Sequence, residues 1–248
     1  MNFLLEICCF NIQSALIAQD AGAHRVELCA DPEGGGTTPS LGLIKMAREK
    51  LHIQLYPIIR PRDGDFLFND EEFEIMMNDV LLCKQHGCDG VVIGMLNSDG
   101  TIDKKRCSKL VELAYPLEVT FHRAFDRAVN PFEAMEDIIS IGCERILTSG
   151  QKPTAIEGAV LLNELVRQAE NRIIIMPGSG IRGNNIIELK EKTTAEEFHT
   201  SARIFAKTQM EFINESMKEN NSYTIADENE IMQIIHLLDK SQTFSGGQ

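Results

Sequence analysis

The sequence contains no tryptophan and only three tyrosines, and aromatic residues make up 6% of its 248 positions. Positive charge is also scarce, because 24 lysines and arginines stand against 37 aspartates and glutamates and leave a net charge of −13. An acidic chain of this kind is repelled by nucleic acid and by anionic membrane surfaces. We therefore expect no nucleic acid and no membrane among its main partners.

Long hydrophobic runs are absent as well, since no apolar stretch approaches the roughly 18 residues of a membrane-spanning helix. The N-terminal segment MNFLLEICCFN lacks the basic region of a signal peptide, and Glu6 interrupts its short apolar stretch. The seven cysteines follow no repeated spacing, which in a chain of this length indicates a reducing compartment. These features predict a cytoplasmic protein.

Short runs rich in Val, Ile, Leu and Phe recur along the chain and predict eight β-strands. Helical patterns fill most of the gaps between them. Eight strands alternating with about eight helices predict an α/β fold, a single-domain (β/α)8 TIM barrel over residues 1–204, with a doubly wound open sheet as the alternative. The predicted strands span residues 4–9, 25–30, 53–60, 90–96, 118–125, 145–149, 172–176 and 197–202.

The sequence changes character after the eighth predicted strand. Residues 203–221 are polar and irregular, whereas residues 227–239 carry apolar side chains at helical spacing. We expect a C-terminal extension over residues 205–240, with a helix that closes the barrel or contacts another subunit. Residues 241–248 are expected to form a disordered tail.

The second predicted strand carries a polar residue at every other position. Arg25, Glu27 and Cys29 share one face, and three apolar residues share the other. In a barrel the apolar face meets the helices, so the polar face must point into the lumen. The first strand repeats this pattern with Glu6 and Cys8, and Glu-x-Cys therefore occurs on two successive strands.

Other strands add polar side chains to the same end of the barrel. His122 belongs to the fifth strand, His199 to the eighth, and Arg60 closes the third. Active sites of this architecture lie at the C-terminal ends of the strands. Buried charges are costly unless they are paired, so two interpretations are open: a structural ion-pair network, or a binding site, which we favour for the whole set. The network would consist of Glu6, Arg25, Glu27 and Arg60.

Two glycine-rich loops follow predicted strands. Residues 34–36 precede a helix but lack the lysine of a Walker-A loop, so an anion site and a tight turn are both open there. Gly178 and Gly180 belong to a G-x-G-x-x-G stretch after the seventh strand, where barrels of this class often bind phosphate. Their backbone amides are predicted to bind phosphate or carboxylate, with a permissive turn as the alternative.

The segment FHRAFD at residues 121–126 places three reactive side chains at a strand end. His122 is a candidate general base or metal ligand, and Arg123 can pair with Asp126 or with an anionic ligand. With Glu27 as a further acid or base and Arg60 as a further clamp, they predict an enzyme pocket for a small anionic or phosphorylated substrate. Its catalytic candidates are His122, Glu27 and Asp126, and its ligand-binding candidates are Glu6, Arg25, Arg60, Arg123, Gly178, Gly180 and His199.

Six segments in order resemble the CutC family, whose members are described as copper-homeostasis proteins. They are ELCADPEGGGTTPSLG, IRPRDGDFLF, VTFHRAFD, RILTSG, MPGSGI and EFHTSA, and the resemblance runs from residue 5 to about residue 202. It implies a cytoplasmic (β/α)8 barrel that forms a homo-oligomer, a dimer or a tetramer. It also implies that Cu(I) binds to two cysteines of the first two strands, which correspond to Cys8 and Cys29; soft thiolates suit this ion.

Two functions are therefore open. The first is a copper-homeostasis protein that binds Cu(I) as its metal, and the second is a barrel enzyme that acts on a small anionic ligand. They depend on different residues: Cys8 and Cys29 for the first, and Arg60, His122 and Arg123 for the second.

Overall fold

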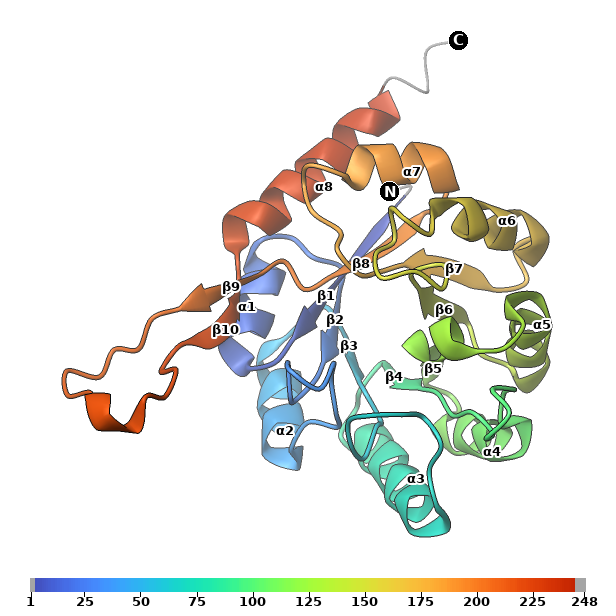
Figure 1. Cartoon of the computed structure of the whole chain (residues 1–248), viewed down its shortest axis with the longest axis horizontal. Helices are drawn as coiled ribbons and strands as arrows, with labels where there is room; N and C mark the ends of the chain where they lie inside the picture. The colour runs from blue at the N-terminus through green and yellow to red at the C-terminus, as the bar shows by residue number, and fades with distance from the viewer. Residues whose placement is uncertain (1–2, 244–248) are drawn as a thin grey trace.

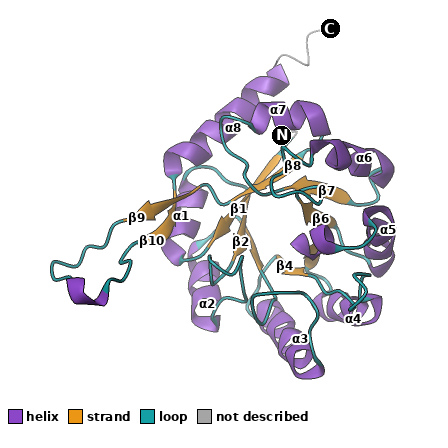
Figure 2. Cartoon of the chain, viewed as in Figure 1, coloured by secondary structure: helices purple, strands orange, loops and turns teal. Residues whose placement is uncertain are grey.

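The structure is a computed structural model that describes residues 3–243 of the chain, without the side chains of residues 242 and 243. Eight short strands form its centre, arranged in a ring with helices outside (Figures 1 and 2). The strands are β1 (Leu4–Cys9), β2 (Arg25–Leu28), β3 (Gln54–Pro57), β4 (Gly90–Ile93), β5 (Glu118–Phe121), β6 (Arg145–Thr148), β7 (Ile174–Pro177) and β8 (Glu197–Thr200).

The strands form two parallel four-stranded sheets, in the orders β3-β2-β1-β8 and β4-β5-β6-β7. The sheets continue into each other just after β3, where Ile58 forms a parallel bridge with Val92 and the Ile59 amide donates to the Val92 carbonyl at 2.8 Å. On the opposite side of the ring, β7 lies next to β8 (Figure 2). This arrangement confirms the predicted (β/α)8 TIM-barrel fold.

Seven helices between the strands cover the outside of the ring (Figure 2). Their ends follow local sequence signals: Asn69 and Glu72 form a capping box at the start of the third helix, and Asn130 caps the fifth, which has Pro131 at its first position. The helices are α1 (Ile12–Asp20), α2 (Leu41–Lys50), α3 (Asp70–Gln85), α4 (Lys104–Ala114), α5 (Pro131–Ile141), α6 (Ala159–Ala169) and α7 (Ile186–Thr193).

The fifth strand is shorter than the predicted 118–125. It ends at Phe121, and the 3-10 helix η1 (Arg123–Arg127) follows after a single extended residue, His122. The Nδ1 atom of His122 accepts a hydrogen bond from the Ala124 amide at 3.1 Å and so caps η1. Because the His122 side chain caps η1, the strand ends before this residue. The apolar pattern of the sequence does not reveal this competition between strand pairing and helix capping.

A β-hairpin follows β8, and the prediction of an irregular segment from residue 203 onward is wrong for this part of the chain. β9 (Arg203–Ala206) pairs antiparallel with β10 (Tyr223–Ala226). The connection includes a short 3-10 helix, η2 (Glu215–Met217), and it projects away from the barrel (Figure 1). The hairpin exposes large apolar side chains, with Phe205 at 66% and Phe212 at 76% of their full surface.

The last helix, α8 (Glu228–Thr243), lies against α1 and α7 (Figure 1). Its side chains Ile231, Ile234 and Leu238 are fully buried, as the apolar spacing of this segment predicts. The predicted tail begins inside this helix at residue 241, and its residues 244–248 lie outside the described part of the chain. No helix within residues 3–243 combines the length and the hydropathy of a membrane-spanning segment.

The barrel has an apolar outer layer and a partly polar interior. Val26 and Leu28 of β2 are fully buried with the core that joins strands to helices, whereas Arg25 and Glu27 are buried on the other face. The alternation predicted for this strand is therefore observed. It concentrates charged side chains in the lumen, where each needs a partner.

Candidate functional site

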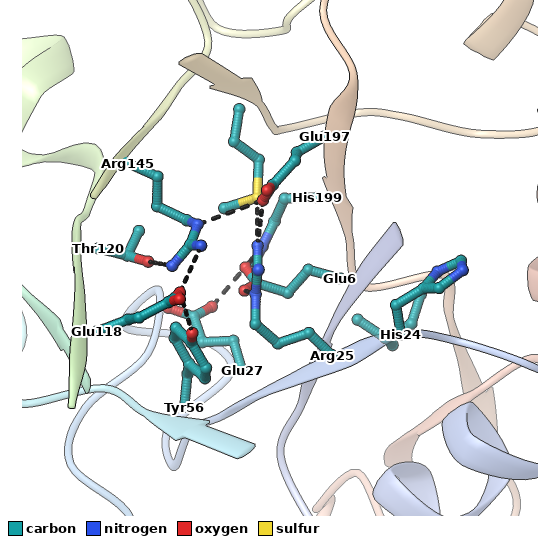
Figure 3. Close-up of polar contacts among 12 residues, drawn as sticks. Glu6, His24, Arg25, Glu27, Tyr56, Glu118, Thr120, Arg145, Glu197 and His199 are labelled. Carbon is teal, nitrogen blue, oxygen red and sulfur yellow. Dashed lines mark hydrogen bonds and ion pairs between the residues drawn. The ribbon is translucent and has the colours of Figure 1, made fainter. Parts of the chain in front are cut away.

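A buried ion-pair network occupies the part of the lumen near the N-terminal ends of the strands (Figure 3). The parallel register sets Arg25 beside Glu6, and the Arg25 Nε donates to the Glu6 carboxylate. The Arg25 Nη2 lies 2.6 Å from a carboxylate oxygen of Glu197, to which Arg145 also donates, from Nε, at 3.2 Å. The two arginines thus share one carboxylate between them.

The network continues to the opposite side of the barrel. Arg145 donates from Nη2 to Glu118 at 2.7 Å, and the Tyr56 hydroxyl donates to the same carboxylate at 2.5 Å. The guanidinium groups of Arg25 and Arg145 lie 5.0 and 5.3 Å from the centre of the Tyr56 ring. These contacts fix the side chains that fill the bottom of the barrel.

The ion-pair network therefore includes Glu6 and Arg25, whereas Glu27 reaches it through His199 and Arg60 donates to loop carbonyls instead. Burial opposes ionisation of Glu6, yet the charge of Arg25 and the hydrogen bond with His199 lower its pKa to about 2. Glu6 and Arg25, two of the predicted ligand-binding residues, are absent from the lining of the cavity that opens beyond them in the described structure.

A cavity of about 350 Å³ lies at the C-terminal ends of the strands, next to the network. Its size is that of a small-ligand site, and its position is the one at which barrels of this class bind ligands. Of the predicted site residues, the described structure brings seven to its wall: Cys8, Glu27, Arg60, His122, Arg123, Gly180 and His199.

Cys8 and His199 line this cavity, whereas Cys29 contacts Cys8 and is absent from the described lining. The Sγ atoms of Cys8 and Cys29 are 3.5 Å apart. His199 connects them to the network, because its Nδ1 hydrogen-bonds with Glu6 at 2.6 Å while its Nε2 lies 3.7 Å from a Glu27 oxygen. Cys8, Glu27 and His199 each place one ligand atom within 4.8 Å of the others, a donor set that can hold a metal ion.

The electrostatics of this group favour a thiolate at Cys8. The hydrogen bond from Cys29 lowers the pKa of Cys8. Burial opposes this shift and His199 adds to it, so that the pKa is about 6. Burial and the same hydrogen bond raise the pKa of Cys29 well above 9. Burial and the neighbouring Cys8 likewise raise the pKa of Glu27. Burial opposes a charged His199, but its hydrogen bonds to Cys8 and Glu6 raise its pKa.

His122 lies in the cavity wall as a buried donor. Its Nδ1 accepts from the Ala124 amide, so the neutral ring carries its proton on Nε2, which has no partner among the described residues. Burial and the charge of Arg60 lower the pKa of His122 to about 3. This arrangement suits a neutral hydrogen-bond donor to a ligand oxygen better than the predicted general base.

Arg60 holds the neighbouring loops in place. Its Nη1 donates to the carbonyls of Gly34 and Gly36, both at 2.8 Å, and its Nη2 donates to the Gly64 carbonyl at 3.1 Å. Its Nε is buried and has no partner within the described chain. The first glycine loop therefore binds an arginine through its carbonyls, and the buried Nε of Arg60 is left for a ligand.

Asp126 is fully engaged in positioning the loops after β5 and β6. Its carboxylate accepts from the Thr148 hydroxyl at 2.5 Å, from the Ser149 amide at 3.0 Å and from Arg123 at 2.7 Å. In the described structure it does not line the cavity, although Arg123 does. These hydrogen bonds hold the two loops in position. The surroundings of Asp126 are therefore those of a residue that stabilises the structure, although the sequence predicts a catalytic role.

The two predicted anion-binding glycines of the second glycine loop have different surroundings. The Gly178 amide donates to the Thr148 carbonyl at 2.9 Å and is thus occupied by the contact between the ends of β6 and β7. Gly180 lines the cavity in a left-handed conformation with φ of 72°. Only the second of these two predicted anion-binding amides is therefore placed at the cavity.

Two arginines of the cavity wall were not predicted, Arg182 and Arg203. Arg182 stands inside the glycine stretch GSGIRG, whose glycines alone were interpreted. Arg203 follows β8 in the segment predicted to be irregular. The strand-face analysis could have found Arg145 of the buried network, because it opens β6 on the face that points into the lumen.

The fold and the cavity define a barrel protein with a candidate site for a small ligand or a metal at the C-terminal ends of its strands. The model of the CutC family matches residues 3–204. The chain belongs to the CutC family.

Similar proteins cover nearly the whole chain. The family protein CutC of Xylella fastidiosa (strain Temecula1) is 45% identical over 94% of this chain and 88% of its own length. The copper homeostasis protein cutC homolog of Homo sapiens is 43% identical over 91% of this chain and 83% of its own length.

Solved structures agree on the fold. The crystal structure of CutC from Streptococcus agalactiae, with 34% identity, matches 80% of this chain and 98% of its own with a TM-score of 0.77. Phosphoribosyl anthranilate isomerase from Thermotoga maritima matches 94% of this chain and 97% of its own with a TM-score of 0.60. Its identity of 14% restricts this likeness to the fold.

Proposed function

We propose that this chain serves copper homeostasis by binding Cu(I) through Cys8 and Cys29. Relatives named copper homeostasis protein support the general role. The observation that carries the ligand assignment is the 3.5 Å separation of the sulfur atoms of Cys8, which lines the cavity, and Cys29. Two thiols at this separation provide soft ligands, and the lowered pKa of Cys8 supplies a thiolate at neutral pH.

The surroundings of the two sulfurs fit a monovalent soft cation. The positive charge of Arg25 is held by Glu6 and Glu197 rather than directed at the thiols. Burial and the neighbouring Cys8 raise the pKa of Glu27, which opposes a second negative charge beside Cys8. His199 offers an imidazole nitrogen within reach of Cys8, and imidazole also binds copper.

An anaerobic Cu(I) titration against a competing chelator tests this proposal. Wild type is expected to bind one ion per chain, and the variant with both Cys8→Ser and Cys29→Ser is expected to bind about a hundredfold more weakly. Cys107→Ser is the matched control, because Cys107 is buried like Cys29 but lies on α4 outside the barrel. Equal affinity of the double variant and the control would refute the ligand assignment.

We further propose that the protein works in the cytoplasm as a homo-oligomer, a dimer or a tetramer. All seven cysteines are free thiols, a state that a reducing compartment maintains. The projecting hairpin exposes Phe205 and Phe212, apolar side chains that a second subunit would cover.

A barrel enzyme that acts on a small anionic or phosphorylated substrate is a second candidate function. The buried Nε2 of His122 favours it, since an unpaired buried donor is costly and a ligand oxygen would satisfy it. In this role His122 would polarise the substrate, and Glu27, whose pKa is raised by burial, would be the general acid. Turnover that survives Cys29→Ser but not His122→Asn would support the enzyme, whereas a lack of turnover of small phosphate esters would count against it.

A further inference from the structure

We infer that this cavity contains a subsite for the phosphate group of a small phosphorylated organic molecule. Arg182, Arg203 and the backbone of the loop between β7 and α7 form it. This inference rests on the second candidate function, whose substrate class it narrows, and it is independent of the copper proposal.

The charge of the cavity wall points to an anion. Four arginines and two histidines line the described cavity, and Glu27 is the one carboxyl group among the described lining residues. In a chain with a net charge of −13, this concentration of positive charge around one cavity attracts anions selectively to it.

Arg182 and Arg203 carry charges that no acidic side chain of the described structure neutralises. Each is held instead by a backbone carbonyl: Arg182 donates to the carbonyl of Arg203 at 3.0 Å, and Arg203 donates to that of Pro32 at 3.2 Å. Two fixed and unneutralised guanidinium groups at one cavity form a strong site for a dianionic phosphate.

The loop between β7 and α7 adds main-chain donors. The amides of Ser179, Gly180 and Ile181 have no acceptor among the described residues, and all three residues line the cavity. Ser179 and Gly180 both have positive φ angles, 80° and 72°. Consecutive amides of such a loop can share the oxygens of one anion.

Two buried donors on the opposite wall also point to a ligand, independently of the arginines. The Nε2 of His122 and the Nε of Arg60 are buried donors without partners in the described chain, although both side chains line the same cavity. His122 exposes 3% and Arg60 4% of its surface. The ligand therefore has a phosphate at one end and a carbonyl or hydroxyl oxygen at the other, within a cavity of about 350 Å³.

Calorimetric titration of the full chain with inorganic phosphate, glycerol 3-phosphate and malonate tests this subsite. Both phosphates are expected to bind, glycerol 3-phosphate more tightly, and malonate is expected to bind at least about tenfold more weakly. Arg203→Gln and Arg182→Gln should each weaken phosphate binding by about tenfold, whereas Arg203→Lys should retain part of it. Arg172→Gln is the matched control, because Arg172 is paired with Glu136 outside the cavity.

Three results would overturn the inference: no binding of either phosphate, equal binding of malonate, or phosphate binding that Arg203→Gln leaves unchanged. Thermal unfolding of each variant shows whether a loss reflects misfolding, and Arg203→Lys keeps the test decisive if the glutamine variant is unstable. Phosphate binding without turnover would reject the enzyme but keep the subsite. Cu(I) affinity of Arg203→Gln should equal that of wild type, which separates this site from the copper proposal.

Discussion

The sulfur atoms of Cys8 and Cys29 lie 3.5 Å apart although 21 positions separate the residues in the chain. The parallel register of β1 and β2 produces this contact, because the Cys29 amide continues the ladder by donating to the Cys9 carbonyl at 2.9 Å. The pair connects the two parts of the lumen: His199 links it to the ion pair of Glu6 and Arg25, and Cys8 opens to the cavity.

Cys8 is expected to be the most reactive thiol of the chain. Its pKa, lowered to about 6, makes it a thiolate at neutral pH, and it lines the cavity. Alkylation by iodoacetamide, followed by peptide mass spectrometry across a pH series, should give a midpoint near pH 6 for this residue. Cys29→Ala should raise the midpoint, since alanine has no group that can donate to Cys8. A midpoint near that of an ordinary thiol would contradict the described hydrogen bond.

Removal of one partner from the buried network should destabilise the fold strongly. Glu6→Gln leaves Arg25 buried with a weakened partner, and breaking such a pair costs about 3–5 kcal/mol. The control is Glu188→Gln, which breaks an exposed pair with Lys192 and should change the free energy of unfolding by less than about 1 kcal/mol. Urea unfolding measures both, and similar losses in the two variants would show that the network contributes nothing special to stability.

His122 should make stability depend on pH. Its pKa is lowered from 6.5 to about 3 in the folded chain, so below pH 6.5 the unfolded chain binds a proton that the folded chain does not. The stability linked to this group is complete above pH 6.5 and falls as the pH drops toward 3.

His122→Asn retains an acceptor for the Ala124 amide but cannot titrate, so it isolates this effect. The free energy of unfolding should fall more steeply from about pH 7 to about pH 5 in wild type than in the variant. Parallel curves from urea unfolding would mean that His122 titrates normally in the folded chain.

The hairpin is expected to hold the subunits together. Phe205→Ser combined with Phe212→Ser removes two exposed apolar side chains and should shift the molar mass from that of a dimer or tetramer toward that of a monomer. Val160→Ser is the control, because Val160 is 75% exposed on α6, away from the hairpin. Light scattering reports the mass, and a monomeric wild type would exclude the oligomer.

The barrel could be predicted from the sequence because each strand is a short apolar run and each helix has recognisable ends. The alternation of Arg25 and Glu27 with apolar neighbours also placed their side chains correctly in the lumen. The division of the lumen into an ion-pair network and a cavity could not be predicted in this way. Strand periodicity gives the face on which a side chain lies but not its position along the barrel axis. Glu6 and Cys8 share a face, yet one belongs to the network and the other to the cavity.

The hydrogen-bond partners of a side chain could not be predicted from the sequence either. Whether Asp126 is free for chemistry depends on the amides of residues 149 and 151, which come from a loop 22 or more positions away. The hairpin escaped prediction because a long connection, and not a short turn, separates its two strands. Short strands of this kind are stabilised by pairing and not by their own sequence.

X-ray absorption at the copper edge of the Cu(I)-loaded protein tests the central claim most directly. If Cys8 and Cys29 bind the ion, the first shell of wild type contains two sulfur atoms, and both disappear in the variant with Cys8→Ser and Cys29→Ser. The Cys107→Ser control should retain them. A first shell without sulfur, or one that the double substitution leaves unchanged, would show that copper binds elsewhere and that these thiols do not form the metal site.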